Sequence, residues 1–123
     1  MQFITLQPML ETKSISDTVS FYTTILGFTL KSSFEEAEEV IWCHLEREGV
    51  SIMFSLPNKV MKYPLVMLSG SLYVTVVNVD ELWNQLKNKC EVVYEPESFV
   101  YGMREFAIKD NNGYVWNFAQ QLT

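Results

Sequence analysis

The chain has 123 residues, 48% of them apolar and 14% aromatic, and this composition excludes a disordered polymer. The formal net charge of −6 argues against a nucleic-acid partner, since proteins that bind the phosphate backbone need clustered Lys and Arg. Two cysteines are too few for a disulfide scaffold; they could form a single bridge, but we expect reduced thiols and a cytoplasmic protein. We also expect no signal peptide and no membrane partner, because no apolar run approaches the ~20 residues of a membrane span.

The first half of the chain predicts the element order strand, helix, strand, strand, strand. Residues 3–10 alternate loosely between apolar and polar side chains, as in a half-buried strand. Ser14 is a capping residue with an acid three positions later, which predicts a helix over about 16–26 that stops at Gly27. Three further strands are predicted at 29–33, 40–46 and 50–56.

The second half predicts the same order of elements. A β-branched and aromatic run at 72–77 predicts a strand, and Asn78 then caps a helix over about 79–89. The turn sequence Asp110–Gly113 is a strong hairpin signal between the last two strands. A linker is predicted at 57–70, because Pro57 cannot continue a central strand. The strands after the second helix are predicted at 92–95, 104–109 and 114–119.

Corresponding landmarks of the two halves are 64 positions apart. This spacing separates the capping residues Ser14 and Asn78, and it also separates the turn glycines Gly49 and Gly113. Chance alignment at some offset is conceivable for each pair, but several landmarks in the same order favour a duplicated unit. Neither half is large enough for a stable core of its own, so we predict one domain of two modules. The predicted boundaries are 1–56 and 71–123 for the modules and 1–123 for the domain.

Two stretches of the sequence carry recognisable motifs. Residues Phe21–Phe28 read FYTTILGF, and residues Tyr101–Gly113 end in the turn DNNG. The first resembles the FYxxxLGF motif of the vicinal oxygen chelate superfamily, which includes glyoxalase I, extradiol dioxygenases and bleomycin-resistance proteins. The second resembles the closing hairpin of that family, with Asn111 in place of the usual Pro. The resemblance implies an α+β fold, in which two tandem βαβββ modules form a curved mixed sheet around a cleft, and a homodimer.

The resemblance also implies four positions for metal ligands. In metal-dependent members, the first strand of each half supplies one ligand, usually a His, and the last strand supplies another, usually a Glu. Counting from the motif and applying the 64-residue offset places these positions at Gln7, Met53, Ser71 and Asn117. None of the four is His, Glu or Asp, and the set is a poor site for a divalent metal. We therefore expect neither a metal nor another cofactor.

Strand alternation extends the predicted cleft beyond these four positions. A short turn after Arg47 would place Met53 opposite His44, and a turn at Asp110–Gly113 would place Asn117 opposite Phe106. A slip of one residue in either hairpin would turn its side chains to the other face. The predicted ligand-binding residues are Gln7, Trp42, His44, Met53, Ser71, Tyr73, Arg104, Phe106 and Asn117.

Several of these residues have an ordinary structural alternative. The aromatic side chains could belong to the core, since a small domain must bury most of its aromatics. Arg104 could bind a ligand carboxylate or phosphate, or it could be a solvated strand residue or pair with Glu105 or Glu46. His44 and Glu46 share a strand face and are weak catalytic candidates, but they could equally be partly exposed strand residues. Cys43 points the other way and is predicted to be buried.

The leading functional hypothesis is a metal-independent small-molecule binding protein that sequesters an antibiotic or another aromatic compound. Sequestration requires affinity but no reactive group, which agrees with the missing metal ligands. The alternative is a glyoxalase-like lyase or isomerase that uses His44 and Glu46, or a relocated metal site. A third possibility is a regulatory or interaction module whose cleft is filled by side chains.

Overall fold

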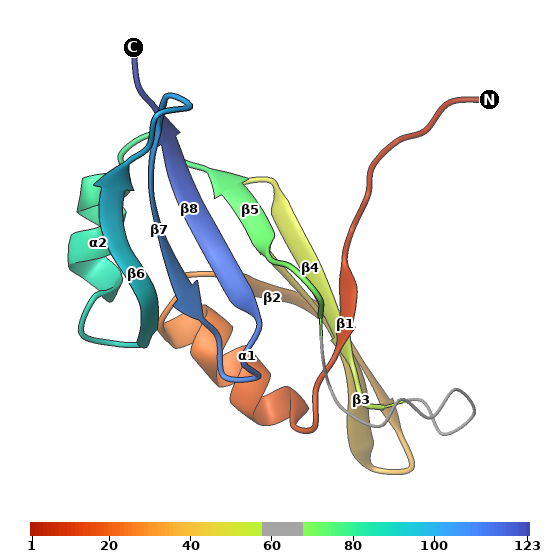
Figure 1. Cartoon of the computed structure of the whole chain (residues 1–123). Coiled ribbons are helices and arrows are strands. Elements are labelled where there is room, and N and C mark those ends of the chain that lie inside the picture. Colours follow the sequence, from red (N-terminus) through yellow and green to blue (C-terminus); the bar gives the residue numbers. More distant parts are fainter. Residues whose placement is uncertain (58–67) are drawn as a thin grey trace. The chain divides into compact units, whose positions relative to one another are not determined.

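The chain folds into two compact units, Met1–Val66 and Met67–Thr123. The computed structural model describes residues 1–57 and 68–123, and Figure 1 shows their helices and strands. Among the described residues, each unit contains one helix and a four-stranded mixed sheet. Most of the predicted linker at 57–70 lies outside the described residues. In the described part of the chain, no helix is long and apolar enough to cross a membrane.

The first unit has the strand order β1-β4-β3-β2 (Figure 1). β1 runs parallel to β4, and the other neighbouring strands are antiparallel. Its elements are β1 (Met9–Glu11), α1 (Ile15–Thr24), β2 (Thr29–Glu36), β3 (Glu39–Arg47) and β4 (Val50–Ser55).

The second unit has the equivalent order β5-β8-β7-β6, again with a parallel first pair and antiparallel pairs after it. The α+β fold of two βαβββ modules, each forming a mixed sheet, is therefore confirmed. Its elements are β5 (Leu72–Thr75), α2 (Val79–Leu86), β6 (Glu91–Ser98), β7 (Met103–Lys109) and β8 (Val115–Gln121).

The predicted helix caps at Ser14 and Asn78, which are 64 positions apart, are confirmed. The Ser14 side chain accepts a hydrogen bond of 3.1 Å from the backbone N–H of Asp17 at the start of α1. The Asn78 side chain accepts one of 3.1 Å from the backbone N–H of Glu81 at the start of α2. Each cap satisfies an N–H that the helix itself leaves without a partner, and an acidic residue in the first turn complements the helix dipole.

Each helix covers one face of the sheet in its own unit. Tyr22 of α1 is fully buried, and its ring centroid lies 5.4 Å from that of Phe28 and 5.1 Å from that of Phe54 in β4. In the second unit, the Trp83 ring of α2 packs edge-on against Phe106 of β7 at 5.2 Å. Strand side chains alternate, so the neighbours of these core residues point to the opposite face. We call that opposite face of each sheet its helix-free face.

The first strand is shorter than predicted. Residues 3–10 were expected to form it, but β1 begins at Met9. Pro8 has no N–H to donate, and only its carbonyl joins the sheet, accepting a 2.9 Å hydrogen bond from the backbone N–H of Met53. The preceding side chains of Phe3, Ile4 and Leu6 are exposed.

The predicted register of the first hairpin is confirmed, and that of the second is wrong. His44 pairs with Met53 as expected. Asn117, however, pairs with Ala107, while Phe106 pairs with Phe118. The second hairpin is therefore shifted by one residue relative to the prediction.

The cause of the shift lies in Asp110. Its Oδ1 accepts backbone hydrogen bonds from Asn112 at 2.8 Å and from Tyr114 at 2.9 Å. The backbone N–H of Asp110 in turn donates to the Tyr114 carbonyl, so Asp110 faces Tyr114 and not Gly113. Gly113 occupies a left-handed conformation, with φ of 87°, that this wider turn requires.

Candidate functional site

Five polar side chains gather on the helix-free face of the second sheet. Their elements are β5, β6, the β6–β7 turn, β7 and β8. Phe106 faces α2, so Glu105 and Ala107 on either side of it point away from the helix. We call the group the tyrosine–glutamate cluster, and its members are Tyr73, Tyr94, Tyr101, Glu105 and Asn117.

Ala107 forms the floor of this cluster. The backbone pairs Tyr73 with Asn117, Asn117 with Ala107, and Ala107 with Tyr94, which makes one row across all four strands. Because Ala107 has only a methyl group, side chains from the non-adjacent strands β6 and β8 can meet above it. The Asn117 Nδ2 accordingly donates a 2.6 Å hydrogen bond to the Tyr94 hydroxyl.

Glu105 is the buried acid of the cluster, with only 4% of its surface exposed. Its Oε1 accepts a hydrogen bond of 3.3 Å from the Tyr94 hydroxyl and another from the Tyr101 hydroxyl. Its Oε2 is also buried, and no group among the described residues meets it with hydrogen-bond geometry. A buried polar atom without a partner is unfavourable in the folded state, so Oε2 is the oxygen of Glu105 that can still accept a hydrogen bond.

The tyrosines around Glu105 remain protonated well above neutral pH. Desolvation by burial and the nearby Glu105 carboxyl group together raise the pKa of Tyr73 to about 12. The hydrogen bond to Glu105 is the main reason that the pKa of Tyr101 is raised above its ordinary value. Desolvation raises the pKa of Tyr94 against a smaller lowering by the Asn117 hydrogen bond. At neutral pH the site therefore presents three phenol O–H groups and one carboxyl group.

Three of the residues predicted for the ligand lie on the helix-free face of the first sheet. Trp42, His44 and Met53 are half-buried there, and the confirmed register places His44 directly beside Met53. The His44 Nε2 is 2.5 Å from the Ser51 hydroxyl oxygen, and the ring centroids of His44 and Trp42 are 6.5 Å apart. Glu46 pairs with Ser51 on the same strands. That these residues contact a ligand stays a prediction.

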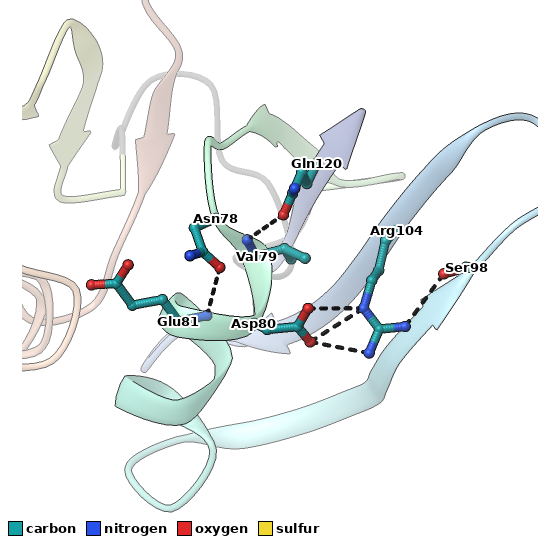
Figure 2. Close-up of polar contacts among 7 residues, drawn as sticks. All are labelled: Asn78, Val79, Asp80, Glu81, Ser98, Arg104 and Gln120. Carbon is teal, nitrogen blue, oxygen red and sulfur yellow. Dashed lines mark hydrogen bonds and ion pairs between the residues drawn. The ribbon is translucent and has the colours of Figure 1, made fainter. Parts of the chain in front are cut away.

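Arg104 lies on the helix side of its sheet and not with Asn117, contrary to the prediction. Figure 2 shows that its guanidinium forms an ion pair with Asp80 in the first turn of α2. The distance from Nη2 to Oδ1 is 3.0 Å, and the distance from Nε to Oδ2 is 3.1 Å. Its Nη1 also donates to the Ser98 hydroxyl at 3.3 Å. Neither of the alternative partners, Glu105 or Glu46, is involved.

One further contact in Figure 2 joins the start of α2 to the sheet. The backbone N–H of Val79 donates to the Gln120 side-chain oxygen of β8 at 2.9 Å, beside the Asn78 cap. Phe106 is fully buried on this same side. The prediction that Phe106 and Arg104 share a face with Asn117 is wrong, because the Asp110 turn shifted β7 by one residue. Both residues therefore serve the attachment of the helix.

The four positions implied for a metal do not form a metal site. Gln7 and Ser71 precede the strands β1 and β5 and are exposed, and Asn117 is engaged with Tyr94. Met53 offers a thioether, which suits soft metals and not the hard or borderline ions of these folds. In the ranges 1–57 and 68–123, no group of three or more His, Cys, Asp or Glu is arranged to hold a metal.

Sequence reasoning missed Glu105, Tyr94 and Tyr101 as site residues. The error follows from the hairpin register, since a shift of one residue exchanges the two faces of a strand. A signal was present, because Asp110 followed by Asn, Asn and Gly is suited to a side-chain-capped turn that adds one residue to the loop. With that turn, alternation would have placed Glu105 beside Asn117.

Comparison with known proteins identifies a matching family and several solved structures with the same fold. The model of the Glyoxalase/Bleomycin resistance protein/Dioxygenase superfamily matches residues 6–118 of this chain. A search of the curated proteins finds no match.

Solved structures with the same fold cover nearly the whole chain. TioX from Micromonospora sp. ML1 is 19% identical, with a TM-score of 0.78 over 95% of this chain and 98% of that one. A glyoxalase-related enzyme from Clostridium phytofermentans is 15% identical, with a TM-score of 0.81 over 99% and 98%. A glyoxalase/bleomycin resistance protein/dioxygenase from Nocardioides is 19% identical, with a TM-score of 0.73 over 99% and 85%. At these identities the likeness establishes the fold alone.

Proposed function

Since the chain belongs to the Glyoxalase/Bleomycin resistance protein/Dioxygenase superfamily, we propose that it binds a small organic molecule without a metal ion. The ligand lies on the tyrosine–glutamate cluster, and an antibiotic or another aromatic compound is the class that suits such a surface. Binding sequesters the compound and requires no chemical step.

The observation that carries this proposal is a buried carboxyl group among tyrosines, Glu105, of which only Oε1 accepts hydrogen bonds from the described residues. A site for a small molecule needs apolar or aromatic walls with a few converging polar groups. The cluster offers both, because the rings of Tyr73, Tyr94 and Tyr101 surround one carboxylate and one amide. The two large exposed rings, Tyr73 and Tyr101, leave the cluster accessible at its edge. Ligand contacts by Trp42, His44 and Met53 on the first sheet remain part of the proposal.

The proposal is tested by a thermal-shift screen of aromatic compounds and antibiotics in buffer that contains EDTA. Binders raise the melting temperature, since a ligand at 100 times its Kd stabilises the folded state by about 2.7 kcal/mol. The stabilisation persists in EDTA. Asn117→Ala weakens binding because it removes the hydrogen bond that holds Tyr94. Asn84→Ala, the same substitution on the exposed side of α2, leaves binding unchanged.

The competing hypothesis is a glyoxalase-like lyase or isomerase that uses His44 and Glu46. Its support is the short contact of His44 with Ser51, which fixes the imidazole ring on the helix-free face of the first sheet. Elemental analysis and thermal shifts with Mn, Ni and Zn separate the two hypotheses. Stoichiometric metal with strong stabilisation, or turnover of a screened compound that His44→Ala abolishes, would replace the binding function by an enzymatic one.

We also propose that the protein is a cytoplasmic homodimer. The exposed apolar side chains of Phe3, Ile4 and Leu6 support self-association, because a second copy would remove them from water. Cys43 and Cys90 are both free thiols, in line with a reducing compartment. Sedimentation at micromolar concentration checks the dimer, and a 14.3 kDa species alone would contradict it.

A further inference from the structure

We propose that Glu105 binds a positively charged nitrogen group, an ammonium or amidinium, carried by an aromatic small molecule. This inference rests on the proposed binding function and specifies the chemistry of its ligand. The ligand nitrogen donates to the Glu105 Oε2 and its ring lies against the tyrosines.

The first argument is the unequal use of the two carboxylate oxygens. The hydroxyls of Tyr94 and Tyr101 both donate to Oε1, whereas Oε2 is buried, and none of the described residues forms a hydrogen bond with it. An ionised carboxylate only accepts hydrogen bonds, so the missing partner must be a donor. Nitrogen groups with several N–H bonds suit this geometry, since one N–H can reach Oε2 while others remain for neighbouring acceptors.

The second argument is charge. Buried carboxylates are normally paired with a cation, because removing a charge from water is costly. In the described part of the chain, the ion pairs of the second unit join Arg104 to Asp80 and Lys109 to Glu91. Glu105 takes part in neither of them. Its neighbour Arg104 points to the other face of the sheet, so this unit supplies no guanidinium at the cluster.

The third argument is the aromatic surroundings. The Tyr101 ring is stacked on Phe99, with centroids 5.3 Å apart and an angle of 6° between the planes. Phe99 in turn meets Tyr94 edge-on at 6.1 Å. Faces of tyrosine and phenylalanine attract cations within about 6 Å of the ring centre, and stacked rings offer a flat surface for an aromatic ligand.

Access to Glu105 passes by Tyr101. This tyrosine is 61% exposed and belongs to the turn between β6 and β7, so its hydroxyl can leave Glu105 without a change in either strand. Tyr94, held by Asn117, keeps its own hydrogen bond to the carboxylate. Movement of the Tyr101 side chain would thus open a path to Oε2 for a ligand cation, while the rest of the cluster stays in place.

The test is a titration of the full-length protein, in EDTA, with benzylammonium, benzamidinium, benzyl alcohol and benzoate, followed by NMR. We expect both cations to bind about tenfold more tightly than benzyl alcohol, which is the effect of one charge-assisted hydrogen bond, and benzoate to bind most weakly. Glu105→Gln keeps the shape of the side chain and abolishes the preference for the cations. Glu81→Gln removes the same charge from the exposed start of α2 and leaves the preference intact.

A measurement on the unaltered protein covers the case in which Glu105→Gln does not fold. The cations should shift the side-chain carboxyl carbon resonance of Glu105, and benzyl alcohol should shift it much less. Equal binding of benzyl alcohol or benzoate, or an unmoved Glu105 resonance, would overturn the inference and leave the binding function standing. Failure of all four probes, together with failure of the aromatic screen, would overturn both.

Discussion

The two sheets share one framework but carry different chemistry on their helix-free faces. Met9 pairs with Met53 in the first unit as Tyr73 pairs with Asn117 in the second, in agreement with the 64-residue offset. On the neighbouring strand the offset changes, because Trp42 pairs with Ser55 whereas Glu105 pairs with Ala119.

The cause of this difference is the turn in each hairpin. In the first unit, Glu48 and Gly49 both have positive φ and form a tight turn that pairs Arg47 with Val50. In the second unit, Asp110 widens the turn, and Lys109 pairs with Val115. One turn residue thus decides which side chains of β7 face the cluster. As a result, the second sheet has the carboxylate of Glu105 at the position where the first sheet has the indole of Trp42.

The largest effect is expected from the two cores. Phe106→Ala and Tyr22→Ala each remove a fully buried ring between a helix and its sheet, and each should lower the free energy of unfolding by about 3–5 kcal/mol. If the two units form one domain, both variants lower the midpoint of a single urea transition, monitored by circular dichroism. Two separate transitions, each sensitive to only one variant, would contradict the single domain.

The next largest effect is expected at Ala107, whose equivalent in the first sheet is His44. Ala107 pairs with Asn117 as His44 pairs with Met53. Ala107→Leu should lower the free energy of unfolding by about 1–3 kcal/mol, since it inserts a large side chain between Asn117 and Tyr94, and it should abolish ligand binding. His44→Leu, at a position that already holds a large side chain, should be milder in a urea titration. Equal effects would show that the faces do not differ.

The helix caps should respond alike in both units. Ser14→Ala and Asn78→Ala each remove one side-chain hydrogen bond to a helix N–H, at a loss of about 1 kcal/mol. Thermal unfolding of the two variants measures this. A difference of more than about 1 kcal/mol between them would argue against equivalent helix starts.

The smallest effect is expected on the stability of the folded state at alkaline pH. Tyr73 has its pKa raised to about 12 from an ordinary value of 10.0, so the folded state holds a proton that the unfolded state has released. Its contribution to stability is complete below pH 10 and is lost as the pH rises through about 12. Absorbance at 295 nm should show the late ionisation of Tyr73, and Glu105→Gln should make it earlier. An unchanged titration curve in that variant would contradict the coupling.

The fold was largely predictable from the sequence, but the site was predictable only in part. Capping residues, turn glycines and the FYTTILGF motif act locally, and they placed both helices and the duplicated topology correctly. The tight turn at Glu48 and Gly49 also fixed the register of β3 and β4. In the second hairpin, the register depended on whether the Asp110 side chain would replace a backbone partner, and the resulting shift moved Phe106 and Arg104 to the helix side.

Glu105 illustrates why the site in the second sheet was not predictable from the sequence. Its burial depends on hydroxyls from Tyr94 and Tyr101, which lie eleven and four positions away and meet it only after the strands pair. The small size of Ala107, which allows Asn117 to reach Tyr94, has meaning only in the correct register.

The central claim, metal-independent binding at the tyrosine–glutamate cluster, is tested most directly by mapping a bound ligand. The measurement is an amide chemical-shift titration of the full chain, in EDTA, with the strongest binder from the aromatic screen. We predict the largest shifts at Glu105, Ala107 and Asn117, with unchanged affinity when EDTA is omitted. Shifts confined to His44 and its neighbours, or binding that disappears in EDTA, would contradict the claim.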